Sequence, residues 1–192
     1  MLELPFGLGV AGFSGKLSDH SMSVYLQWSR IFHAEGITNR VLDAQGNLLG
    51  YALFADLDGL DDIGQARMRL KGTQQFMGVD DAFIFRSGRR GFHVVVPGIY
   101  GKAHAIQFAA LMESGHSLSQ FESRGEMTLR ISEKRGKPIT FVETYKGNQA
   151  VVLSGPHLAA LVEIWGVPER FIRQGASMGE RFERKRYISA NI

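Results

Sequence analysis

The chain has 192 residues, of which 44% are hydrophobic and 21% charged, the balance of a globular domain that can bury its own core. The absence of cysteine excludes disulfide bonds and any zinc site built on cysteine ligands. No apolar run approaches the ~20 residues of a membrane-spanning helix, and the N-terminus lacks the basic segment of a secretory signal. We therefore expect a cytoplasmic protein with no membrane partner.

The formal net charge is +3, and the charged residues are unevenly distributed. Every aspartate lies at or before Asp81, whereas arginine and lysine dominate from Arg86 onward and end in the run 181–186. A basic second half suits binding to a phosphate backbone, although a run of this kind is also typical of a solvated helix face.

Apolar periodicity predicts the elements of the first half. A pattern of helical period indicates an amphipathic helix over 21–35, and the apolar stretch 48–57 is typical of a buried strand. The segment 63–77 returns to helical period. Two short apolar runs, 81–86 and 92–96, flank the turn sequence SGRRG and predict a hairpin with a basic tip.

The second half predicts further helices and strands. We expect a helix over 102–113, followed by strands over 127–132, 139–145 and 149–153. Serine and proline then begin a helix over 154–165, and the basic remainder is partly helical. Strands alternate with helices while the hairpin is antiparallel, which predicts an α+β fold with a mixed or antiparallel sheet.

The first chemical signal is a pair of carboxylates at the end of the strand predicted over 48–57. Side chains two residues apart on a strand point to the same face, so Asp56 and Asp58 lie together. Neighbouring carboxylates repel unless a cation lies between them, and oxygen ligands suit Mg²⁺ or Mn²⁺. The pair could instead begin a turn at Gly59. A phosphatase nucleophile loop is a third reading, but Leu60 stands where that loop has threonine.

The second signal is the basic hairpin. Ser87, Arg89, Arg90 and His93 cluster around one turn, and the guanidinium groups match phosphate oxygens bidentately. This set of donors could bind a triphosphate, or the turn could be an ordinary hairpin tip with solvated arginines. A carboxylate pair followed by a phosphate-binding turn is the combination that nucleotidyl transfer requires.

The order of strand, ADLDG, helix, strand, SGRRGFH and strand resembles the catalytic core of the archaeo-eukaryotic primase superfamily. The resemblance implies a sheet like that of an RNA-recognition motif, with an N-terminal αβ unit. It implies one domain over 1–192, made of an N-terminal part (1–47), a catalytic core (48–153) and a helical, basic C-terminal part (154–192). It also implies a DNA primase or primase-polymerase that works on a single-stranded DNA template with nucleoside triphosphates and Mg²⁺ or Mn²⁺.

Site residues follow from the same resemblance. Asp56 and Asp58 match the metal-binding pair, and Ser87, Arg90 and His93 match the triphosphate-binding motif, with Arg89 beside them. The superfamily has a third acidic residue on a later strand, where this chain has no aspartate. Our candidate for the third catalytic and metal-binding carboxylate is Glu143, with Glu133 as the alternative.

Basic residues near the third carboxylate could bind template or primer phosphates, or could face solvent; they include Arg130, Lys134 and Lys146. We expect Phe83, Phe85 and Phe92 to belong to the core rather than to stack on bases.

Other functions fit the same residues. The chain could be a nucleic-acid-binding replication factor that kept the fold and lost catalysis, since the third site would hold a glutamate. A metal-dependent phosphatase or nuclease could use the same carboxylates. Primases often work with a helicase or an accessory subunit, and the short chain suggests a minimal replication enzyme of a virus or mobile element.

Overall fold

The computed structural model describes residues 8–18, 21–43, 45–131, 137–147, 152–153, 165–168, 173–174 and 181–190. The chain divides into two compact units, one made of residues 1–35 and 186–192 and the other of residues 36–185. The predicted boundaries after residues 47 and 153 stay predictions.

The first unit contains a long antiparallel ladder. Strand β1 (Leu8–Ser18) pairs with the first part of β2 (Ser21–Leu42), from Leu8 opposite Arg30 to Ser18 opposite Ser21. The helix predicted over 21–35 is therefore wrong. Residues 22, 24, 26 and 28 are all apolar and alternate with mainly polar neighbours, and this period of two is the strand pattern that the helical interpretation overlooked.

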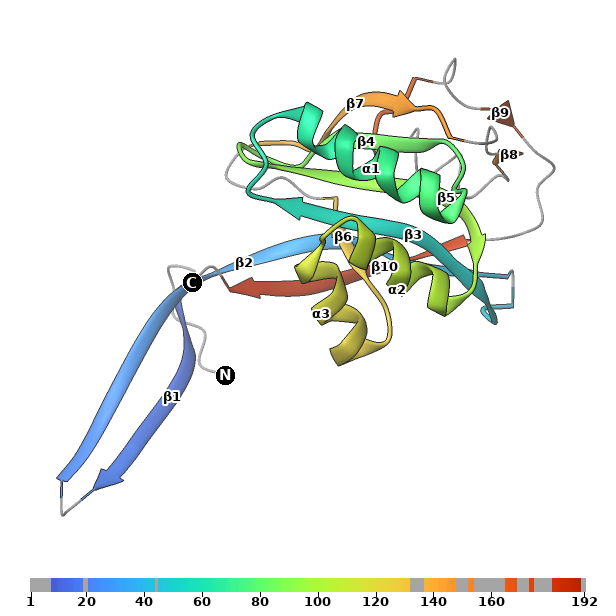
Figure 1. Ribbon diagram of the computed structural model, residues 1–192. Coiled ribbons are helices and arrows are strands. Elements are labelled where there is room, and N and C mark those ends of the chain that lie inside the picture. Colours follow the sequence, from blue (N-terminus) through green and yellow to red (C-terminus); the bar gives the residue numbers. More distant parts are fainter. Residues whose placement is uncertain are drawn as a thin grey trace. The chain divides into compact units, whose positions relative to one another are not determined.

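The second unit is built on an antiparallel sheet, so the predicted α+β class is confirmed (Figure 1). The end of β2 pairs with β3 (Leu48–Asp58), and the order continues through β5 (Gly91–Tyr100) and β4 (Ala82–Arg86) to β7 (Thr140–Tyr145). A short strand, β6 (Thr128–Arg130), also pairs with β2.

Three helices lie among the described residues: α1 (Ile63–Met77), α2 (Lys102–Leu111) and α3 (Gly115–Arg124). The first has its predicted bounds, because Asp62 caps its start by accepting from the Gly64 N–H and Gly78 ends it in the left-handed conformation. The third was not predicted. Within the described part of the chain, no helix combines the length and apolar character needed to cross a membrane.

Two predictions, the end of one strand and the helical C-terminal tail, differ from the structure. Strand β5 continues through Pro97 and Gly98, where the sequence predicted its end, because an irregularity in its pairing with β3 and a φ of 145° at Gly98 accommodate them. The prediction of a partly helical C-terminal tail is wrong for 181–190, which form strand β10. This strand pairs with β2, because the main-chain N–H and carbonyl groups at a strand edge need hydrogen-bond partners.

Two further segments complete the described chain. Strands β8 (Val152–Leu153) and β9 (Arg173–Gln174) form a separate parallel pair. The helix predicted over 154–165 lies, except for its last residue, outside the described residues.

The two faces of the sheet differ. Asp56 pairs with His93 and His93 with Phe85, so these side chains share one face, here called the acidic face. Ala55, Val94 and Ile84 are paired in the same way on the opposite face, here called the helical face because α1 and α2 cross it (Figure 1).

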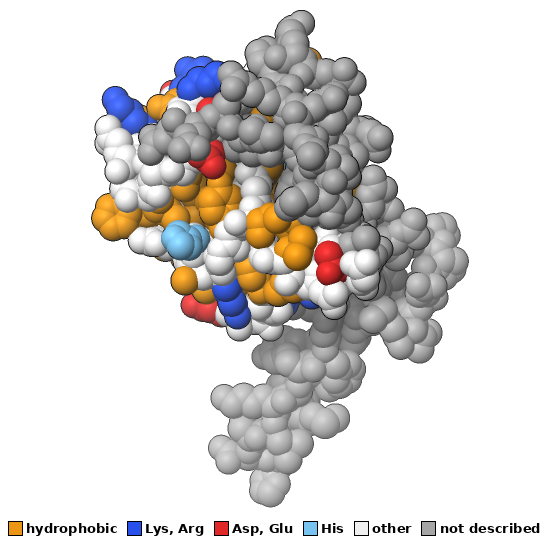
Figure 2. Space-filling view, turned by 90° about the vertical axis from the view of Figure 1, so that its right-hand side faces the viewer, with side chains coloured by type: hydrophobic (Ala, Val, Ile, Leu, Met, Phe, Trp, Pro, Cys, Tyr) orange, Lys and Arg blue, Asp and Glu red, His pale blue; other side chains and the backbone are white. Residues whose placement is uncertain are grey.

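Both faces of the sheet are packed. On the acidic face, the Trp165 ring lies 5.2 Å from that of Phe85 and 6.2 Å from that of Phe54. Phe83, Phe85 and Phe92 are all buried, which confirms them as core residues. Hydrophobic side chains also reach the surface in the view of Figure 2. The exposed ones of the described chain include Leu48 and Ile99, at the end of the sheet away from Asp58.

The buried side chain of Asn39 on β2 joins β3 to the residue that precedes β6. Its amide donates to the Ala52 carbonyl at 3.2 Å and its oxygen accepts from the Met127 N–H at 2.9 Å. Asn39→Ala would leave both buried groups without this partner, so we expect a loss of ~2–4 kcal/mol in the free energy of unfolding measured with urea. The exposed Asn47→Ala, which removes a hydrogen bond to Asp43, is the control and should cost under ~1 kcal/mol. Equal losses in the two variants would contradict the prediction.

Candidate functional site

The acidic face carries Asp56 and Asp58 at the end of β3. Asp56 lies directly opposite His93 of β5, and the Oδ1 atom of the aspartate is 3.5 Å from Nε2 of the histidine. The side chains are 18% and 2% exposed, so the histidine lies beneath the surface, against the carboxylate. Its predicted contact with a triphosphate stays a prediction, while its position makes it a neighbour of Asp56.

Ser87 and Asp58 meet above Gly91. The Ser87 N–H donates to the Gly91 carbonyl at 3.2 Å, which closes the hairpin. A Cβ atom placed on Gly91 would lie 2.9 Å from Ser87 Oγ and 3.6 Å from Asp58 Oδ1. The hydroxyl and the carboxylate therefore approach the same small space, and glycine keeps that space open. The structure thus brings one predicted metal ligand, Asp58, close to one predicted phosphate donor, Ser87.

The hairpin tip is fastened to the loop between β3 and α1. Arg90 Nε lies 2.8 Å from Asp61 Oδ1, and the Gly59 N–H donates to the Arg90 carbonyl at 3.1 Å. Both charged side chains are more than half exposed, so this ion pair is weak and a phosphate could replace the carboxylate. Arg89 is exposed beside it.

Arg130 belongs to the same end of the sheet. It lies on β6, and its Nη2 donates to the Ser87 carbonyl at 2.5 Å. Arg130, which could bind template or primer phosphates by its sequence position, is thus in contact with the turn that the sequence predicts to bind a triphosphate.

Glu143 does not lie beside the carboxylate pair, and the prediction that it shares their metal site is wrong. It pairs with Ile84 on the helical face, whereas Asp56 and Asp58 lie on the acidic face. The reason is an irregularity at Val142: Phe141 pairs with Phe85, but Glu143 already pairs with Ile84, so the face changes. There Glu143 accepts hydrogen bonds from Arg67 of α1, which raise the pKa of that guanidinium.

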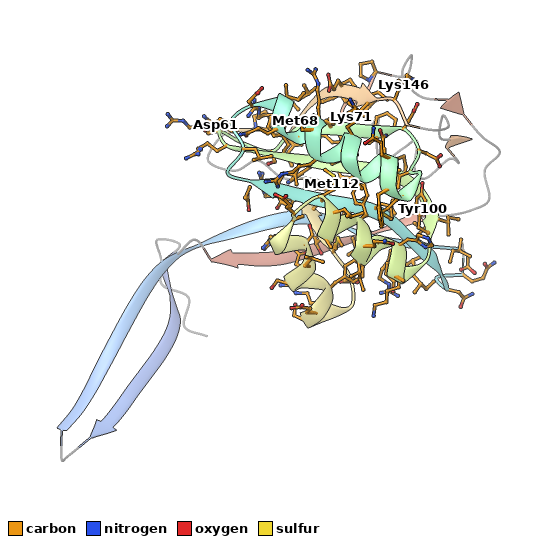
Figure 3. The ribbon with its side chains drawn as sticks, viewed as in Figure 1. Asp61, Met68, Lys71, Tyr100, Met112 and Lys146 are labelled. Atoms are coloured by element: carbon orange, nitrogen blue, oxygen red, sulfur yellow. The ribbon has the colours of Figure 1, made fainter. Side chains whose placement is uncertain are left out.

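The other predicted residues are distant or undescribed. Lys146 Nζ lies 3.2 Å from Asp81 Oδ2. Lys146 is at the opposite end of the sheet from Asp61 (Figure 3), so it is not part of this site. Lys134 and the alternative carboxylate Glu133 lie outside the described residues.

The carboxylates of Asp56 and Asp58 suit a metal ion that needs few protein ligands. Among the described residues no group of three histidine, aspartate or glutamate side chains could enclose an ion. Mg²⁺, however, is commonly held by one or two carboxylates together with water and substrate phosphates. Asp56 and Asp58, on one face and with Asp58 exposed, fit that role.

Two residues of the site gave no signal in the sequence. Ser114 and Ser117 are buried and donate or accept hydrogen bonds at the main chain of Asp56. Serines three residues apart at the start of a helix are ordinary capping residues by sequence, so only the contact itself identifies them.

Comparison of the chain with family models, curated proteins and solved structures finds no match.

Proposed function

We propose that the chain is a template-directed nucleotidyltransferase of the primase type, with the core fold of the archaeo-eukaryotic primases. The proposal rests above all on one observation: Asp56 and Asp58 share a face of β3, and Ser87 of the basic hairpin lies beside Asp58 at Gly91. Carboxylates for a divalent cation and donors for phosphate oxygens, within one small space, are what nucleotidyl transfer requires.

Each group has a role in the proposed reaction. Asp56 and Asp58 would hold Mg²⁺ or Mn²⁺, which supplies Lewis-acid chemistry to an attacking 3′-hydroxyl and a departing pyrophosphate. The Ser87 hydroxyl and the guanidinium groups of Arg89 and Arg90 bind and orient the triphosphate of the incoming nucleotide. Arg130 holds the Ser87 carbonyl, which keeps the turn in place. The proposed partners are single-stranded DNA, nucleoside triphosphates and a helicase or accessory subunit.

The direct test is synthesis. The protein is incubated with a single-stranded DNA template and labelled nucleoside triphosphates in the presence of Mg²⁺ or Mn²⁺, and product lengths are measured. Labelled oligonucleotides, longer than the single labelled nucleotides supplied, are expected, and chelation of the metal should stop their formation. Shortened DNA or free phosphate would instead indicate a nuclease or phosphatase.

Glu143→Gln is expected to leave synthesis within about twofold of the unaltered protein. The glutamate lies on the helical face and pairs with a half-exposed Arg67, so its loss removes only a weak surface interaction. Initial rates of nucleotide incorporation measure the effect. A loss of more than ~100-fold would return Glu143 to the metal site and contradict the face assignment.

A second candidate is a nucleic-acid-binding replication factor without catalysis. It is favoured by the position of Glu143, because the described residues then offer only two carboxylates to a metal. Titration with Mn²⁺ separates the two functions. A catalytic site should bind the ion and lose it on Asp58→Ala, whereas a factor that only binds DNA should retain DNA binding with no specific Mn²⁺ site.

A further inference from the structure

The main chain of Asp56 is held by two serine side chains from far along the sequence. Ser114 Oγ donates to the Asp56 carbonyl at 2.8 Å, and the Asp56 N–H donates to Ser114 Oγ at 3.0 Å and Ser117 Oγ at 3.1 Å. The two hydroxyl oxygens lie 2.7 Å apart, and the serines are 1% and 2% exposed. Buried side chains thus satisfy both main-chain groups of one residue.

Strand β3 needs these partners because, among the described strands, only β5 pairs with it at Asp56. The N–H and carbonyl of Asp56 bond to the serines, so they point away from β5, on which His93 is the opposite residue. On that other edge, β2 pairs with β3 only from Leu48 to Tyr51. The serine hydroxyls therefore stand where a neighbouring strand would otherwise bond.

The side chain of Ser114 contacts Asp56 instead of capping helix α3. It occupies the N-cap position of α3, where a serine oxygen normally accepts from the first free N–H groups of the helix. Its side chain makes no such capping hydrogen bond. The hydroxyl is directed at Asp56 instead, which points to a role at the site rather than in the helix.

The corner before Ser114 is fixed from α1. Glu113 has a φ of 53°, an unusual backbone conformation for a residue other than glycine, and the Ser114 N–H donates to the Ala109 carbonyl at 2.9 Å. Arg69 holds this corner by donating to the Met112 carbonyl at 3.1 Å and by pairing with Glu113 at 2.8 Å. A strained corner persists where the surrounding contacts determine it, so Ser114 has a defined direction.

We infer that Ser114 and Ser117 are positioning residues that set the metal affinity of the Asp56–Asp58 pair. The inference rests on the proposed function of that pair. The hydrogen bonds fix the main chain at Asp56 and therefore the direction of its carboxylate relative to that of Asp58. Removing a group that holds a metal ligand in place typically lowers metal affinity or activity ~10–100-fold.

The test compares three variants of the full chain. Ser114→Ala removes the hydroxyl and Ser114→Thr restores one. Ser123→Ala removes an exposed hydroxyl of α3 that, among the described residues, donates to the carbonyls of Ser119 and Gln120 in its own helix. Mn²⁺ affinity is measured by electron paramagnetic resonance, and kcat and the nucleotide KM are measured in the synthesis assay. Circular dichroism and the melting temperature confirm that each variant is folded.

We expect Ser114→Ala to weaken Mn²⁺ binding and lower kcat at least ~10-fold while the nucleotide KM changes less than ~3-fold. Ser114→Thr should recover most of the affinity, and Ser123→Ala should match the unaltered protein. If Ser114→Ala does not fold, Ser117→Ala, which keeps both Ser114–Asp56 hydrogen bonds, should show a smaller loss of the same kind.

Two outcomes overturn the inference and can be told apart. Unchanged Mn²⁺ affinity in folded Ser114→Ala or Ser117→Ala, with binding lost in Asp56→Asn, would refute the positioning role and leave the proposed function standing. Absence of Mn²⁺ binding and of synthesis in the unaltered protein would overturn the proposed function and this inference together.

Discussion

Asp56→Asn is expected to lower the rate of oligonucleotide synthesis at least ~10³-fold and to leave the protein folded. The amide has the shape of the carboxylate but no charge, so it is a poor ligand for Mg²⁺ or Mn²⁺. Metal catalysis contributes several kcal/mol to the stabilisation of a transition state, and each ~1.4 kcal/mol corresponds to a factor of ten in rate. Rates of nucleotide incorporation at saturating metal measure the loss.

The matched control for Asp56→Asn is the same chemical change at the other end of β3. Asp43 lies in the turn between β2 and β3, where it accepts hydrogen bonds from Asn47, and Asp43→Asn should leave synthesis within about twofold. The unfolding transition of both variants should stay close to that of the unaltered protein, since isosteric amides keep the packing. Full activity of folded Asp56→Asn would remove the basis of the proposed function.

Phe85→Ala is expected to destabilise the protein by ~3–5 kcal/mol, a large part of the ~5–15 kcal/mol typical of a domain. Phe85 is 0% exposed, and its ring centroid lies 5.2 Å from that of Trp165 and 6.0 Å from that of Phe141. Phe85 also pairs with His93 on the neighbouring strand. Its loss would leave a cavity beneath the site. Urea unfolding followed by tryptophan fluorescence measures the change, because Trp165 is a direct neighbour.

Phe76→Ala serves as the control for the core substitution. This phenylalanine lies on α1 and is 69% exposed, so its removal should cost less than ~0.5 kcal/mol. A similar loss of stability in the two variants would show that Phe85 is not a core residue of the folded protein.

Local sequence rules were sufficient where an element has strong end signals or a long apolar run. Helix α1 has its predicted bounds because Asp62 and Gly78 mark its ends, and the buried strand β3 was recognised from its apolar stretch. They failed over 21–35, where the apolar residues fit a helix as well as a strand. In the structure this segment is a strand that pairs with β1. They also missed α3, whose apolar positions are sparse.

The sequence by itself determined the antiparallel hairpin, the carboxylates of Asp56 and Asp58 on one face, and the basic turn that follows them, because a strand alternates its side chains whatever surrounds it. Only the tertiary structure decided the rest of the site. The irregularity at Val142 turns Glu143 to the opposite face, since a shift of one residue in pairing exchanges the faces of a strand. Ser114 reaches Asp56 across a separation of 58 residues, and such a contact exists only once the chain has folded.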